Sequence, residues 1–240
     1  MNAFVDAFGW LLDGENWSGG QGLGTRLVEH IGISALTLLV ATLAAVPLGL
    51  WLGHLGRGQV VAINLGNVGR AVPTLAVLVL FAFLPAPLGA NTFSFVLALS
   101  LFALPPLLTN TYVGVREVDR DVVDAARGLG MSGWEVLTKV ELPLAAPLVF
   151  TGLRLAGVQI VATATVIGLV SGGALGRTIS SGFTRGDQPQ VIGGAILVTL
   201  LALLTEYLLG RLERLAQRRS SGSQAQQAPA GMPGAQTAAA

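Results

Sequence analysis

Charged side chains gather in one stretch of this chain, Val115–Pro143, which lies between two long apolar blocks. Ten of the 27 charged residues of the protein (14 basic and 13 acidic) fall there. The stretch has no cysteine, no histidine and no catalytic motif, so its carboxylates, guanidinium groups and single lysine offer ion pairs and hydrogen bonds rather than catalysis. Such groups suit contact with another protein surface, or simply with solvent.

Two short helices are predicted within this stretch, and the first is bounded by local signals. Asp119 can cap it, and it runs Arg120–Arg127 and ends at Gly128 or Gly130. Gly130 is predicted to take a positive φ, which only glycine adopts without strain. It would then set the angle between the two helices.

The second helix begins at Ser132 and Glu135, whose S-x-x-E spacing lets each side chain satisfy the other's backbone amide. It is predicted to close before Pro143. A helix, a glycine turn and a second helix exposed between membrane spans have the shape of a docking element. A solvated inter-helix loop is the alternative.

The composition predicts an all-α integral membrane protein. Of the residues, 52% are hydrophobic and only 11% are charged, and the mean hydropathy is +0.68, whereas about a quarter of a soluble domain is charged. No basic cluster with interleaved aromatic residues indicates nucleic-acid binding. The absence of cysteine excludes disulfides and thiolate metal sites, and His30 and His54 are too few and too isolated for a metal site.

About five transmembrane helices are predicted from apolar runs near the roughly 20 residues that cross a bilayer. They cover Ile31–Leu52, residues 60–84, Phe93 to Leu108 or Tyr112, Pro147–Val170 and Val191–Leu209. Residues 1–25 predict an interfacial helix that lies on the membrane. Residues 26–215 form the transmembrane domain with the loop at 115–143. Residues 216–240, rich in Gln, Ala, Ser, Gly and Pro, predict a disordered tail.

The basic residues predict the orientation, because cytoplasmic loops carry an excess of lysine and arginine. With five spans, nine of the 14 basic residues share one side with the polar loop and the C-terminus. The opposite side has only Arg26, Arg177 and Arg185. The loop and the C-terminal tail are therefore predicted to be cytoplasmic, and the N-terminus to be outside.

Arg70 and Arg154 are the two charges predicted at membrane depth, where an arginine costs about 2.5–3.5 kcal/mol and must face protein or water. Arg154 can also snorkel to the cytoplasmic surface. Asn64, Asn67 and Arg70 recur at three-residue steps and form a polar stripe. The stripe either lines a translocation path or packs at a subunit interface.

Small residues on the fourth span predict a helix-packing face, because lipid gives no hydrophobic drive to helix association and close approach must replace it. These residues are Gly152, Ala156 and Gly157. A gate hinge at Gly168, or at Gly172 and Gly173, is a second use of glycine in this region.

The polar loop resembles a known family motif. Asp124-Ala125-Ala126, then Gly130, then Glu141-Leu142-Pro143 are similar to the EAA loop of binding-protein-dependent ABC importers. The resemblance implies that these residues form the coupling helix, which seats in a groove on the ATPase subunit. Asp124 departs from it, since the family usually has Glu there. The chain has no G-x-x-x-x-G-K-[ST] motif, so ATP and Mg²⁺ would be bound by the partner ATPase, with no cofactor, metal or catalytic residue in this chain.

Residues 30–215 resemble the compact permeases of osmoprotectant importers in four stretches. These begin at Arg70, Thr109, Val140 and Ser171. The resemblance implies a type I ABC importer permease fold in the bacterial inner membrane. It also implies glycine betaine, choline, carnitine or proline betaine as the solute, a second permease subunit, two ATPase subunits and an extracytoplasmic solute-binding protein. The Trp and Tyr residues form no cage by spacing for a quaternary ammonium, and the family places recognition in the binding protein.

Two rival functions remain open. One is an ABC permease for another solute, such as an amino acid. The other is an ion-coupled secondary transporter, which would be expected to need a membrane-buried carboxylate, and Glu206 is the one candidate in the predicted spans. The solute and the choice between a homodimer and a heterodimer stay undecided by the sequence.

Overall fold

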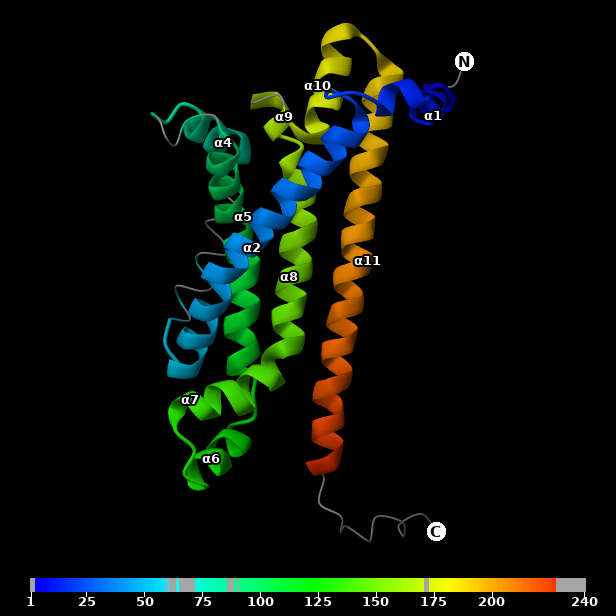
Figure 1. Ribbon diagram of the computed structural model, residues 1–240. Helices are drawn as coiled ribbons and strands as arrows, with labels where there is room; N and C mark the ends of the chain where they lie inside the picture. Colours follow the sequence, from blue (N-terminus) through cyan, green and yellow to red (C-terminus); the bar gives the residue numbers. More distant parts are fainter. Residues whose placement is uncertain are drawn as a thin grey trace, which may run out of the picture.

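The computed structural model describes residues 3–58, 60, 64, 72–85, 89, 91–170 and 173–227, with side chains described through residue 218. Every regular element within these ranges is a helix, so the all-α prediction is confirmed there. The helices form one bundle, with a small helical cap at each end (Figure 1).

Four long helices make the body of the bundle. They are α2 (Leu23–Leu55), α5 (Thr92–Arg116), α8 (Leu142–Ala164) and α11 (Gln188–Gln227). Each contains an apolar stretch long enough to cross a bilayer, and together they match four of the five predicted spans. Of the remaining predicted span, residues 60–84, the structure describes 60, 64 and 72–84. Its described part contains α4 (Thr74–Ala82).

Small residues bring these helices together. Helix α5 contacts α2 and α8, and α11 packs along α8 (Figure 1). A Cβ added at Gly49 would lie 2.8 Å from Thr111 Cβ, and one at Gly53 would lie 2.7 Å from Val115 Cβ. The α2–α5 contact therefore depends on backbones that approach without side chains between them.

The predicted packing face on the fourth span is confirmed, and it serves two neighbours. Gly152 faces α5, because a Cβ there would lie 3.1 Å from the Pro106 carbonyl oxygen. Ala156 is fully buried in the same cluster as Leu107. Gly157 faces α11, where a Cβ would meet Leu209 Cδ1 at 2.6 Å. Helix α8 is thus held between α5 and α11.

Helix α11 is longer than predicted and continues to Gln227, into the segment predicted to be disordered from residue 216. Alanine, glutamine and arginine are good helix formers, and adding a residue to an existing helix needs no new nucleus. A helical span can therefore extend into a polar segment that has no core of its own. Residues 228–240 lie outside the described residues.

The end of the bundle with the N-terminus is capped by short helices (Figure 1). Helix α1 (Ala3–Leu12) exposes Phe4, Phe8 and Leu12, in keeping with an interfacial helix, and is followed by the 3₁₀ turn η1 (Gly14–Trp17). Between the fourth and fifth predicted spans lies α10 (Ala174–Arg185), after the single turn α9 (Ile167–Val170).

The backbones of these two short helices approach closely at Gly168. A Cβ on it would lie 2.0 Å from the Gly176 carbonyl carbon, a distance no side chain tolerates. Gly168 therefore serves backbone packing between α9 and α10.

Candidate functional site

The polar loop stands at the opposite end of the bundle from α1 and α10 (Figure 1). Its first helix, α6 (Arg120–Gly128), begins as predicted, with the Asp119 side chain accepting a hydrogen bond from the Asp121 amide at 2.9 Å. Gly130 has φ of +84°, which confirms the predicted left-handed turn. No heavy atom of the described structure lies within 4 Å of the Cβ position at Gly130, so φ alone demands glycine there.

The second helix, α7 (Gly133–Val136), begins with the predicted capping box. The Ser132 side chain accepts from the Glu135 amide, and the Glu135 carboxylate accepts from the Ser132 amide at 3.0 Å. Lys139 donates to the same carboxylate at 2.8 Å. The Lys139 ammonium, then the Ser132 amide and hydroxyl, lower the pKa of Glu135 to about 2, so this carboxylate is ionised at neutral pH.

The second helix does not close before Pro143, and that prediction was wrong. A π-helical turn, η2 (Leu137–Glu141), joins α7 directly to α8. Pro143 lies in the first turn of α8, where a missing N–H is tolerated once the preceding turn has changed its hydrogen-bond register. The resulting helix runs from Gly133 to Val170, 38 residues, more than the roughly 20 that a bilayer needs. Its polar first turns therefore project beyond the membrane.

A small apolar core holds the two loop helices together. Val118, Val123, Ala126 and Val136 are buried in it, with Met131, Val140 and Leu144 against them. Of the motif residues, Ala126 therefore faces inward, whereas Asp124 and Ala125 are exposed on the far side of α6. The loop is a folded unit with a defined outer surface.

The outer surface of the loop carries two large apolar side chains that sequence reasoning missed. Leu129 is 85% exposed and Trp134 is 72% exposed. They follow α6 and open α7, on either side of Gly130. Large apolar groups held out from a folded element indicate a contact surface. The sequence offered one indication of these two residues, which is that both lie beside the predicted glycine turn.

Glu141, the first residue of the predicted Glu-Leu-Pro end of the loop, is completely buried and joins the loop to the first span. Its Oε2 lies 2.6 Å from Nδ1 of His54, near the C-terminal end of α2. The other carboxylate oxygen, Oε1, has no hydrogen-bond partner among the described residues. A Cβ at Gly133 would lie 3.3 Å from His54 Nε2, so the ring also packs against the start of α7. Leu142 and Pro143 continue directly into α8.

Only part of the predicted polar stripe lies among the described residues. Asn64 is exposed, and Asn67 and Arg70 lie outside the described residues. No group of three or more His, Cys, Asp or Glu side chains that could hold a metal occurs in the described ranges.

Arg154 is paired with α11. Its Nη1 lies 2.9 Å from Glu213 Oε2, and its Nε lies 3.4 Å from Glu206 Oε1. The Thr151 hydroxyl donates to Glu213 Oε1 at 2.7 Å. Arg154 thus forms a polar link between α8 and α11, and Glu206, the carboxylate considered for ion coupling, is one of its partners.

Long apolar helices packed through small residues, with a folded two-helix loop projecting from one end, are the architecture of an integral membrane protein. The family model for "Binding-protein-dependent transport system inner membrane component" matches residues 45–219. The chain therefore belongs to this family of inner-membrane transport components.

Named relatives agree with that assignment. The chain is 34% identical to the glycine betaine/carnitine/choline transport system permease protein OpuCB of Bacillus subtilis, over 78% of this chain and 84% of that protein. It is 36% identical to the carnitine transport permease protein OpuCB of Listeria monocytogenes, over 81% of this chain and 88% of that one.

Solved structures show the same fold. An inward-facing form of the MetNI methionine ABC transporter matches with a TM-score of 0.69 and 19% identity, covering 81% of this chain and 95% of that chain. The predicted type I ABC importer permease fold is confirmed at this level.

Proposed function

We propose that this chain is one transmembrane half of an ATP-driven importer for quaternary-amine osmoprotectants, delivered by an extracytoplasmic solute-binding protein. The solute class rests on the relatives, whose names specify glycine betaine, carnitine and choline. A second permease subunit, either a copy or a homologue, completes the pore, and two ATPase subunits bind ATP and Mg²⁺.

The loop is the element that contacts the ATPase in this proposal. The observation that carries it is the exposure of Leu129 and Trp134 on a loop with its own apolar core. A solvated inter-helix loop has no need of such a core or of exposed large apolar groups. Asp124 and Ala125 lie on the exposed side of α6 and add a polar contact, whereas Ala126 packs inside.

The last three motif residues transmit the contact to the membrane. Glu141, Leu142 and Pro143 stand where the π-helical turn becomes α8. Because α7, the π-helical turn and α8 form one continuous helix, a displacement of the loop by the ATPase moves α8 with it. Gly130 sets the angle at which α6 follows.

In this proposal the loop and the C-terminal end of α11 face the cytoplasm, and α1 and α10 face outward. The charge asymmetry of the sequence supports that orientation, and so does the need for the loop to meet a cytoplasmic ATPase. Asn64, Asn67 and Arg70 keep both proposed roles, in a translocation path or at the interface with the second permease subunit.

Ion-coupled transport is disfavoured by the surroundings of Glu206. Its side chain is 47% exposed and pairs with Arg154. A coupling carboxylate is expected to sit at membrane depth and to exchange an ion during transport. A carboxylate held by an arginine near the end of its span serves helix packing instead.

Reconstitution tests the proposal. The chain, its ATPase and its solute-binding protein in proteoliposomes should take up radiolabelled glycine betaine or choline only with internal ATP, and a protonophore should not stop uptake. Leu129→Ser with Trp134→Ser should abolish co-purification of the ATPase. Leu203→Ser, at an exposed position on α11, is the matched control and should retain it. ATP-independent uptake driven by an ion gradient would overturn the proposal.

A further inference from the structure

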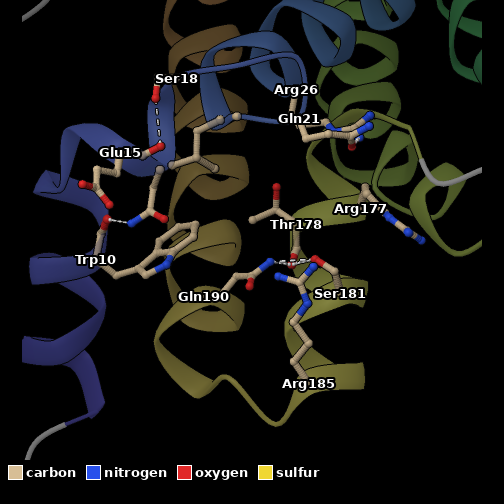
Figure 2. Close-up of a pocket in the computed structure, with 13 residues that line it drawn as sticks. Trp10, Glu15, Ser18, Gln21, Arg26, Arg177, Thr178, Ser181, Arg185 and Gln190 are labelled. Carbon is tan, nitrogen blue, oxygen red and sulfur yellow. Dashed lines mark hydrogen bonds between the residues drawn. The ribbon is translucent and has the colours of Figure 1, made fainter.

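A polar pocket of about 510 Å³ opens at the end of the bundle opposite the loop (Figure 2). Its walls come from the α1–η1 segment, the start of α2, helix α10 and the start of α11. Three arginines line it, together with neutral hydrogen-bonding side chains and one acid, Glu15. The arginines are Arg26, Arg177 and Arg185.

These are the same three arginines that the charge distribution assigned to the outer side. They come from two helices far apart in the sequence, α2 and α10. Membrane orientation does not explain them, because basic residues on this side oppose the usual bias. Their convergence on one pocket points to a local role.

The positive charge of the pocket is only partly balanced. Arg26 is buried and held, with Nη1 3.0 Å from Glu29 Oε2 and a second hydrogen bond to the Gln21 side chain. Arg177 and Arg185 are exposed and form no ion pair with the described residues. Two cations remain for the single lining acid, Glu15, so the pocket favours an added anion.

Hydrogen bonds within this chain hold the neutral wall of the pocket in place without a partner. Gln190 is buried and donates to the Thr178 carbonyl at 2.9 Å and to Ser181 Oγ at 2.6 Å (Figure 2). Asn16 donates to the Trp10 carbonyl at 2.9 Å, which ties η1 to α1. Figure 2 shows the Arg185 guanidinium reaching back toward Ser181 and Gln190.

We propose that this pocket receives carboxylate side chains of the solute-binding protein, with Arg177 and Arg185 as the groups that bind them and Arg26 as a fixed part of the wall. The inference rests on the proposed function, which puts this end outside. Guanidinium groups bind carboxylates through two parallel hydrogen bonds, which give orientation as well as attraction. The pocket would therefore both hold and align the docked protein.

A protein carboxylate fits the pocket better than a lipid phosphate. Glu15 lies in the lining, Asp13 is two residues from it in the chain, and Asp187 is two residues from Arg185. This end of the molecule is therefore of mixed sign, which a folded protein surface with both acidic and basic groups can match. An anionic bilayer presents one sign only.

The test uses the assembled permease–ATPase complex in nanodiscs and its purified solute-binding protein. Arg177→Gln with Arg185→Gln should weaken binding of the solute-loaded binding protein at least tenfold and flatten its salt dependence, because exposed charge pairs are screened by salt. Basal ATPase activity should not change. Arg218→Gln removes one charge at the opposite end of α11 and is the control, which should bind like wild type.

Two results would overturn the proposal. One is a double variant with the affinity and salt slope of Arg218→Gln. The other is a double variant that binds the binding protein like wild type in phosphatidylcholine nanodiscs but, unlike wild type, no longer responds to added phosphatidylglycerol. That result would assign the pocket to a lipid headgroup. If instead the wild-type complex binds no solute-binding protein at all, the proposed function fails rather than the pocket.

A cross-linking measurement locates the contact independently of affinity. The chain has no cysteine, so Ser181→Cys introduces a single thiol at the pocket wall. A photoreactive probe on it should link this chain to the binding protein, at a peptide that contains Asp or Glu. The same probe on Gly128→Cys, in the loop at the other end, should give no such product. Equal yields from both positions would contradict the assignment.

Discussion

The carboxylate of Glu141 lies 2.6 Å from the ring of His54, a residue 87 positions earlier in the chain. The loop is joined covalently to α5 and α8, and this contact is a third connection, to α2. Because Glu141 is fully buried, removal of its partner leaves a buried polar group without its hydrogen bond, which costs about 1–3 kcal/mol.

The first prediction follows from this pair. His54→Ala should lower the stability of the subunit and its uptake activity together, whereas His54→Asn, which keeps a hydrogen-bond donor, should restore much of both. Glu141→Gln replaces the buried carboxyl group with an amide and should rescue His54→Ala in part. Thermal unfolding and uptake at matched expression measure these effects. Additive losses in the double variant would contradict a direct interaction.

The second prediction concerns the turn of the loop. Gly130→Ala should cost about 1–2 kcal/mol, because a side chain is strained at φ of +84°, even though space is open around it. Gly130→Val should add a β-branch to this strain and disconnect solute uptake from ATP hydrolysis.

Gly128→Ala is the matched control for Gly130, since it also meets no heavy atom within 4 Å and ends a helix that alanine favours. It should leave stability and uptake nearly unchanged. Stimulation of ATPase activity by loaded binding protein is the measurement. Wild-type stimulation in Gly130→Val would count against the loop as the coupling element.

The third prediction separates the two acids that pair with Arg154. Glu213 is buried and bonded to Thr151 as well, so Glu213→Gln should weaken the α8–α11 contact. The Glu206 side chain is 47% exposed, and it lies farther from Arg154, at 3.4 Å, than Glu213 does at 2.9 Å. Glu206→Gln should therefore keep near-normal stability and uptake. Loss of uptake with normal folding in Glu206→Gln would revive an ion-coupled mechanism.

The fourth prediction tests the proposed orientation. Thr184 on α10 and Arg218 near the C-terminal end of α11 are exposed. Helix α10 and the C-terminal end of α11 lie at opposite ends of the bundle (Figure 1). In intact cells, Thr184→Cys should react with a membrane-impermeant thiol reagent, whereas Arg218→Cys should react only after the membrane is opened. The reverse pattern would invert the topology and place the polar loop outside.

Features that depend on near neighbours in the chain could be predicted from the sequence. The Asp119 cap, the Ser132–Glu135 box and the positive φ at Gly130 each involve residues no more than three positions apart. Such hydrogen bonds form wherever the helix ends. Four of the five predicted spans also match long helices, because apolar length alone decides whether a helix can cross a bilayer.

Pairings between distant residues were decided only by the tertiary structure. His54 appeared isolated in the sequence, and Arg154 appeared free to reach the cytoplasmic surface, until the packing of α2 and α11 gave each a carboxylate. The π-helical turn before Pro143 likewise depends on how α7 meets α8. Periodicity states which face of a helix is apolar, but not which helix lies against it. That choice depends on small residues such as Gly49 and Gly157, whose missing side chains let particular backbones meet.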